Sequence, residues 1–175
     1  MVGLPTEPEW ERAAAYPVDL PVIAPGFGRR TYPWGELPMA DNEPDSGLTS
    51  SPTNDIFSVI PANIAETTIG GTSVVGIFPH GAAACGAYDM TGNVWEWCST
   101  PYIPYNEIAS RGFLLPETFD DTLGKSRDER ERTYVLRGGS WINSRSDARC
   151  AYRYSLVLSR RYDFVGVRLA RRFPA

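Results

Sequence analysis

Few residues of this 175-residue chain are able to bind a soft metal ion or act as a nucleophile. The chain contains three cysteines, Cys85, Cys98 and Cys150, and a single histidine, His80. No two cysteines have the CxxC spacing of zinc and redox sites, and one histidine cannot form a histidine-rich metal site. An odd number of cysteines does not indicate a disulfide framework either. The pattern excludes the common zinc and dithiol chemistries.

Side chains suited to binding are concentrated near the C-terminus instead. The stretch YSLVLSRRYDF, residues 154–164, mixes aromatic, aliphatic, hydroxyl and charged residues without a helical or strand period. Tyrosine, phenylalanine and arginine are typical of binding hot spots, because they combine a large contact area with defined polar groups. Leu156, Val157 and Leu158 would form exposed apolar surface unless a partner covers them. The alternative is that these three residues pack inward as a short buried strand.

Only a few regular elements are predicted to position these residues. LPTEPEWERAAA, residues 4–15, predicts a short helix with a capping box formed by Thr6 and Glu9, and with Trp10 and Ala13–Ala14 facing the core. Three strands are predicted late in the chain, after a turn at 89–93, within 133–141 and within 165–173, where Val165, Val167 and Leu169 would share one face. One helix, many loops and late strands indicate an α+β fold with a small antiparallel sheet.

Composition limits the class of protein. Sixteen glycines and fifteen prolines indicate many turns and long loops. A net charge of −4 argues against nucleic acid as the main partner, although the part of the chain from Arg145 onward is locally basic. No apolar run approaches the roughly 18 residues that span a bilayer, so we expect no membrane insertion. The N-terminus lacks the basic and apolar segments of a signal peptide.

Four sequence blocks resemble one protein family. LPTEPEWERAAA, YPWG, YDMTGNVWEW and the C-terminal series LRGGSW, AYR and GVRLA stand in the order found in the formylglycine-generating-enzyme (sulfatase-modifying factor) family. The resemblance covers Leu4 to Ala170. It implies a C-type-lectin-like fold of the α+β class, rich in loops, with a small antiparallel sheet and one or two short helices. It also implies that residues 1–175 form a single domain.

The resemblance has consequences for catalysis. The family's oxidases bind copper(I) through two cysteines separated by four residues, a soft thiolate site that suits this ion. Cys150 matches the second cysteine, whereas Arg145 stands at the first position and cannot provide a thiolate. The histidine-dependent iron relatives are not matched either, since His80 stands alone. We therefore expect no enzymatic activity and no required cofactor. Relatives also place cysteines near Cys98 and Cys150, which we expect to lie close together, as free thiols or as a disulfide.

The family also has a branch of binding proteins, the variable proteins of diversity-generating retroelements. In these proteins, asparagine codons of the form AAY are rewritten, and the products include neither Lys, Glu, Gln, Met nor Trp. Every residue of 154–164, and of 142–144, belongs to the permitted set. The resemblance implies a variable ligand-binding segment at about 142–164. The residues predicted to contact the ligand are Ile142, Asn143, Ser144, Tyr154, Ser155, Leu156, Val157, Arg160, Tyr162, Asp163 and Phe164.

The resemblance further implies a structural calcium ion at the turn YDMTGNVWE. In the family, two side chains and two backbone carbonyls of this turn bind calcium. They correspond to the side chains of Asp89 and Glu96 and to the carbonyls of Gly92 and Val94. Oxygen ligands that include two carboxylates suit this hard cation. The alternative is that Asp89 caps the turn and that Glu96 makes a buried hydrogen bond.

These observations favour a ligand-binding protein without catalytic activity, whose partner is a protein or a cell-surface molecule chosen by the variable residues. Two alternatives stay open. One is a degenerate enzyme of the formylglycine-generating type, with Cys150 as a lone thiol. The other is an interaction domain of the same fold whose residues are not diversified. Location on a virion or on a cell surface would follow from a receptor-binding role.

Overall fold

The computed structural model describes residues 1–18, 28–35, 60–105 and 132–172. Its one α-helix in these ranges is α1 (Glu7–Ala15), and a 3₁₀ turn, η1, spans Ala65–Thr67. The capping box is confirmed, because Thr6 Oγ1 accepts the Glu9 amide while the Glu9 carboxylate accepts the Thr6 amide. Trp10, Ala14 and Ala15 are buried, so one face of this short helix packs against the core.

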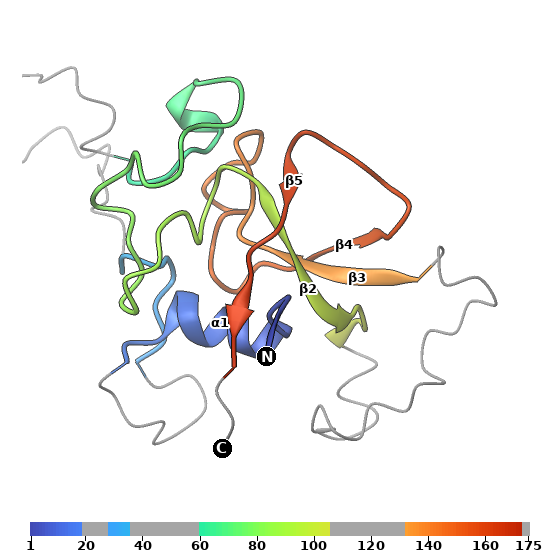
Figure 1. Ribbon diagram of the computed structural model, residues 1–175. Helices are drawn as coiled ribbons and strands as arrows, with labels where there is room; N and C mark the ends of the chain where they lie inside the picture. The colour runs from blue at the N-terminus through green and yellow to red at the C-terminus, as the bar shows by residue number, and fades with distance from the viewer. Residues whose placement is uncertain (19–27, 36–59, 106–131, 173–175) are drawn as a thin grey trace, which may run out of the picture.

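A four-stranded sheet lies beside α1 (Figure 1). Its strands are β2 (Trp95–Pro101), β3 (Thr133–Arg137), β4 (Tyr154–Val157) and β5 (Val165–Gly166), in the order β4-β3-β2-β5. The β2–β3 and β3–β4 pairs are antiparallel, whereas β5 runs parallel to β2. The predicted α+β class with a small, largely antiparallel sheet is confirmed. Because β4 and β5 lie at opposite edges, the chain between them has to cross the sheet.

The predicted strand at 165–173 is two strands instead of one. After β5 the chain leaves the large sheet, and β6 (Ala170–Arg171) pairs antiparallel with β1 (Val2–Gly3) near the N-terminus. Val167 and Leu169 are 63% and 65% exposed, so they do not face a core. The alternating pattern in the sequence is compatible with either arrangement, and pairing with β1 decides between them.

The two faces of the sheet have different roles. Cys98 and Val135 share a buried apolar cluster with Trp10 of α1. Side chains of the opposite parity, such as Trp97 of β2 and Tyr134 of β3, face away from α1 because strand residues alternate between faces. Trp95 is only 3% exposed, whereas Trp141 is half-buried.

Residues 154–164 are neither a buried strand nor a fully exposed loop. Tyr154–Val157 form β4 at the edge of the sheet, where Leu156 and Val157 are half-buried. Leu158 is 39% exposed and begins the connection to β5. An edge strand is open to solvent on one side, which explains the intermediate burial.

Candidate functional site

A cavity lies between the β4–β5 connection and the sheet face that points away from α1. Its volume is about 630 Å³. We call it the Arg160 cavity, after an arginine in its wall. The walls come from the N-terminal segment, β2, β3, the connection and β5: Leu4, Trp97, Cys98, Ser99, Tyr134, Leu158, Arg160, Arg161, Tyr162, Val165, Gly166 and Val167. Two predicted ligand contacts, Arg160 and Tyr162, therefore line a concave site.

The other predicted contacts of this segment surround the cavity wall. Tyr162 stacks on Phe164, with ring centroids 4.8 Å apart and planes 11° apart. Tyr154 lies at the opposite edge, where its ring is 5.3 Å from that of the buried Trp95. Ser155, Leu156 and Val157 are half-buried in β4, while Asp163 is exposed. The predicted set is thus spread along an edge strand and a loop, and only part of it faces the cavity.

Ile142, Asn143 and Ser144 belong to a second region, on the loop after β3. Ile142 is 45% exposed, and Ser144 is exposed as well. Asn143 has a structural role, because its Oδ1 accepts the Ser140 amide at 3.1 Å and the Ser140 hydroxyl at 2.7 Å. Its carbonyl accepts the Ala65 amide at 2.9 Å, which fixes the loop against η1.

Around Arg145 this loop meets residues from two distant segments. The Arg145 amide donates to Glu66 Oε1 at 2.9 Å, and the Tyr32 hydroxyl donates to the Arg145 carbonyl at 3.0 Å. Trp34 stacks on Tyr32, with planes 7° apart. We call this region the Arg145 surface and define it by Tyr32, Trp34, Glu66, Trp141 and Ile142–Arg145. Tyr32, Trp34 and Glu66 were not predicted from the sequence, where the aromatic pair in YPWG was the available signal.

The Arg145 surface contains buried polar atoms without a hydrogen-bond partner among the described residues. They are Oε2 of Glu66 and the indole nitrogens of Trp34 and Trp141. Leaving such a group unpaired costs about 1–3 kcal/mol. One acceptor and two donors at this surface are therefore buried and require a hydrogen-bond partner, which a ligand or a water molecule would supply.

The two buried cysteines are free thiols with little reactivity. Cys98 and Cys150 lie in the same apolar cluster without a disulfide. Burial raises the pKa of each thiol to about 12, so both are protonated at neutral pH.

Arg145, at the position of the family's first copper-binding cysteine, exposes 55% of its side chain and pairs with Glu66 at 3.6 Å. Within the described residues, no three His, Cys, Asp or Glu side chains gather as a metal site. These donors do not fit a copper(I) dithiolate site.

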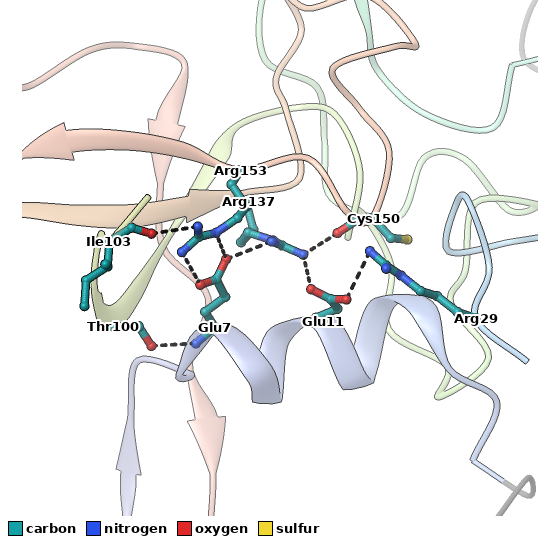
Figure 2. Close-up of polar contacts among 8 residues, drawn as sticks. All are labelled: Glu7, Glu11, Arg29, Thr100, Ile103, Arg137, Cys150 and Arg153. Carbon is teal, nitrogen blue, oxygen red and sulfur yellow. Dashed lines mark hydrogen bonds and ion pairs between the residues drawn. The ribbon is translucent and has the colours of Figure 1, made fainter. Parts of the chain in front are cut away.

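An ion-pair network connects α1 with the sheet on the other face (Figure 2). The fully buried Arg137 of β3 donates to Glu7 at 2.8 Å, to Glu11 at 2.7 Å and to the carbonyl of Cys150. Arg153 donates to both oxygens of Glu7, at 2.6 and 2.8 Å. This network was not predicted from the sequence. The signal was the like-charged pair at i and i+4 in α1, which is unfavourable unless a cation bridges it.

The predicted calcium ligands have protein partners in the structure. Asp89 Oδ2 accepts the Gly76 amide at 2.6 Å, and Glu96 accepts the Trp10 indole at 2.7 Å and the Arg168 guanidinium at 2.8 Å. A cation at Glu96 would have to compete with Arg168. Gly92 is required in the turn, since its φ is +77° and a Cβ would lie 2.3 Å from the Asn63 carbonyl oxygen. The calcium assignment, with Val94 as the fourth ligand, stays a prediction.

Comparisons with known proteins agree with the fold. Residues 2–173 match the family described as the sulfatase-modifying factor enzyme 1-like domain. A hercynine oxygenase of Mycolicibacterium thermoresistibile is 36% identical over 173 residues, which are 95% of this chain and 31% of that protein. PvdO from Pseudomonas aeruginosa superposes with a TM-score of 0.57 at 26% identity, over 96% of this chain and 51% of the other. Treponema denticola variable protein 1 superposes with a TM-score of 0.56 at 24% identity, over 96% and 46%.

These relatives correct two expectations. The expectation that the chain is not an enzyme is wrong, because its relative at 36% identity over 95% of the chain is an oxygenase. The expectation that no cofactor is required is wrong for the same reason, since oxygenases generally use a metal or an organic cofactor to activate oxygen. The prediction was based on Arg145, which replaces one of the two copper-binding cysteines. That replacement excludes a copper(I) dithiolate site, but it does not exclude catalysis by other means. The chain spans about a third of the length of this relative. Among the described residues, no helix is long and apolar enough to cross a membrane.

Proposed function

The chain belongs to the family of sulfatase-modifying factor enzyme 1-like domains, and we propose that it serves an oxygenase of the hercynine oxygenase kind as a substrate-binding domain. The proposal is supported by the similarity to hercynine oxygenase along nearly the whole chain. It assigns substrate binding to the Arg145 surface. It assigns no residue to oxygen activation, because no three His, Cys, Asp or Glu side chains gather among the described residues.

The unpaired polar atoms of the Arg145 surface are the observation that carries this proposal. Glu66 uses Oε1 to hold the Arg145 amide, and Oε2 keeps its capacity to accept a hydrogen bond. The indole nitrogens of Trp34 and Trp141 are donors without partners in the described part of the chain. A substrate with both donor and acceptor groups would satisfy these atoms. Such preformed polar atoms beside aromatic rings favour orientation of a small molecule.

Binding of hercynine tests the proposal. Isothermal titration of the protein with hercynine should give saturable binding, and Glu66→Gln should weaken it by about tenfold or more, since hydrogen bonds to a charged group are the stronger ones. Glutamine keeps the acceptor for the Arg145 amide, so the loop should stay in place. Glu9→Gln is the matched control, because Glu9 is a carboxylate of α1 that pairs with Arg172 away from this surface.

Two results would contradict the proposal. One is the absence of heat on titrating the folded wild-type protein with hercynine. The other is equal weakening by Glu66→Gln and Glu9→Gln. A melting temperature for each variant separates loss of binding from loss of fold.

A second candidate is a ligand-binding surface of the variable-protein kind, with a protein or cell-surface molecule as partner. The exposure of the predicted contacts favours it: Ile142, Tyr154 and Tyr162 are 45%, 44% and 43% exposed. Large aromatic side chains at such exposure are typical of binding surfaces. The gene's neighbourhood tests this candidate. A reverse transcriptase gene and a near-copy of the 3′ segment with adenines at these codons would support diversification, and their absence would rule it out.

A further inference from the structure

The arginines that line the Arg160 cavity differ from the arginines of the ion pairs around α1 and β2. Arg137, Arg153 and Arg168 each pair with a carboxylate of Glu7, Glu11 or Glu96. Arg160 and Arg161 have no carboxylate partner among the described residues, and no lining residue of the cavity is acidic. Two neighbouring cations without an anion repel each other, so this arrangement lacks its counter-charge.

The loop holds one of these cations in place. Arg161 Nη1 donates to the carbonyls of Leu158 and Arg160, at 2.5 and 2.8 Å. These bonds hold the backbone of residues 158–160 close to the Arg161 guanidinium. Arg160 makes no side-chain hydrogen bond with the described residues, and its guanidinium fork stays available. One arginine therefore shapes the loop, and the other is free to bind.

The remaining walls are suited to a flat apolar group. Trp97 and Tyr134 come from adjacent strands of the sheet, and Tyr162 comes from the loop, where Phe164 supports its ring. Leu158 and Val165 complete the apolar lining. A volume of about 630 Å³ lies within the range of roughly 300–1,000 Å³ typical of sites for small organic ligands.

We propose that the Arg160 cavity binds a small organic anion, with its carboxylate or phosphate on the Arg160 guanidinium and its flat apolar body against Trp97, Tyr134 and Tyr162. Arginine presents two parallel N–H donors that match either anion. The aromatic walls supply contact area to a ring or an unsaturated chain. This site shares no lining residue with the Arg145 surface, and it does not depend on the function proposed there.

Two fluorescent probes with the same ring body test the charge requirement. Anilinonaphthalene sulfonate carries an anion, whereas N-phenylnaphthylamine is neutral. We expect the folded protein to bind one equivalent of the sulfonate at least about tenfold more tightly than the neutral probe. Arg160→Gln should remove most of this preference and leave binding of the neutral probe unchanged. Arg149→Gln is the matched control, because Arg149 is also exposed and bonds only to the Ser146 carbonyl among the described residues.

Competition then identifies the anion. Displacement of the sulfonate probe by indole acetate assigns a carboxylate ligand, and displacement by phenyl phosphate assigns a phosphate ligand. The proposal is overturned if neither compound displaces the probe, if both probes bind equally well, or if Arg149→Gln weakens binding as much as Arg160→Gln. Hercynine titrated in the presence of the probe separates the two sites, because occupancy of the Arg145 surface should not displace it.

Discussion

The two faces of the sheet use arginine in opposite ways. On the α1 face, Arg137 is fully buried and every hydrogen bond it makes goes to a carboxylate or a carbonyl (Figure 2). On the other face, Arg160 and Arg161 are exposed at a cavity without a carboxylate among its lining residues. A buried cation requires its counter-charges inside the fold, while an exposed one can be solvated until a ligand arrives. The difference separates arginines that hold the fold from arginines that are available for binding.

The contacts on the α1 face also explain why Glu7 and Glu11 stand together in one helix. Glu7 and Glu11 stand one turn apart, and their charges repel. Arg137 lies between them, and Arg153 and Arg29 complete the series at its two ends. Arg153 in turn lies over the rings of Tyr102 and Tyr105, at 4.9 and 4.4 Å. The network joins α1, β3 and the loop at Cys150, which identifies it as a structural element.

The largest expected effect is the loss of Arg137. Arg137→Ala should destabilise the protein by about 3–5 kcal/mol, because it leaves the carboxylates of Glu7 and Glu11 facing a buried gap. The same substitution on the other face, Arg160→Ala, should change stability by no more than about 0.5 kcal/mol. Denaturant unfolding of both variants provides the measurement. Equal losses of stability at the two positions would contradict the distinction between the faces.

A smaller effect is expected from neutralising one acid of the network. Glu7→Gln keeps the shape of the side chain but removes the charge that Arg137 and Arg153 share, and we expect a loss of about 1–3 kcal/mol. Asp163→Asn, the corresponding change on the cavity side, should be nearly neutral because Asp163 is exposed. Chemical denaturation compares the pair. A neutral outcome for Glu7→Gln would mean that the network is solvated in the native state.

Acid titration should measure the contribution of the Glu9–Arg172 ion pair. This pair is more exposed than the buried Arg137 network, but unlike Arg160 its arginine has a carboxylate partner. The hydrogen bonds from Arg172 lower the pKa of Glu9 from 4.5 to about 2. A carboxyl whose pKa is lowered in the folded state stabilises the protein above its unfolded pKa and loses that contribution as the pH falls from 4.5 towards 2. The side chains are 36% and 40% exposed, so the contribution should stay below about 1 kcal/mol. Glu9→Gln should flatten the stability profile in this pH window, and an unchanged profile would refute the assignment.

The smallest effects are expected within the cavity-side loop. Tyr162→Ser should alter stability by about 0.5 kcal/mol or less, because Tyr162 is 43% exposed and its ring stacks on Phe164 at the surface. Leu156→Ser should cost more, since Leu156 is half-buried in β4. Thermal melts of the two variants compare the loss of stability at the exposed Tyr162 with that at the half-buried Leu156. A Tyr162 variant as unstable as Arg137→Ala would place the loop in the structural core.

The sequence by itself determined the local elements and the fold class. Thr6 and Glu9 are three residues apart, so their reciprocal hydrogen bonds form within one turn and the start of α1 was predictable. A strand was predicted within 133–141, where β3 covers 133–137, and a turn was predicted at 89–93, directly before β2. The motifs in LPTEPEWERAAA and YDMTGNVWEW indicated the family, which the match over residues 2–173 confirms. Each of these inferences depends on neighbours in the chain.

Only the tertiary structure decided which residues meet. Glu7 and Arg137 are 130 positions apart, and no local pattern shows that a strand arginine lies between two helix carboxylates. The pairing of β6 with β1 and of β5 with β2 is likewise a long-range choice, which sends the 158–164 connection across the sheet and forms the Arg160 cavity. The burial of each arginine then determines whether it is structural or available for binding. Arg137 and Arg160 are the same residue type in sequence, and the folded surroundings, which either supply or withhold a carboxylate, make one structural and leave the other available for binding.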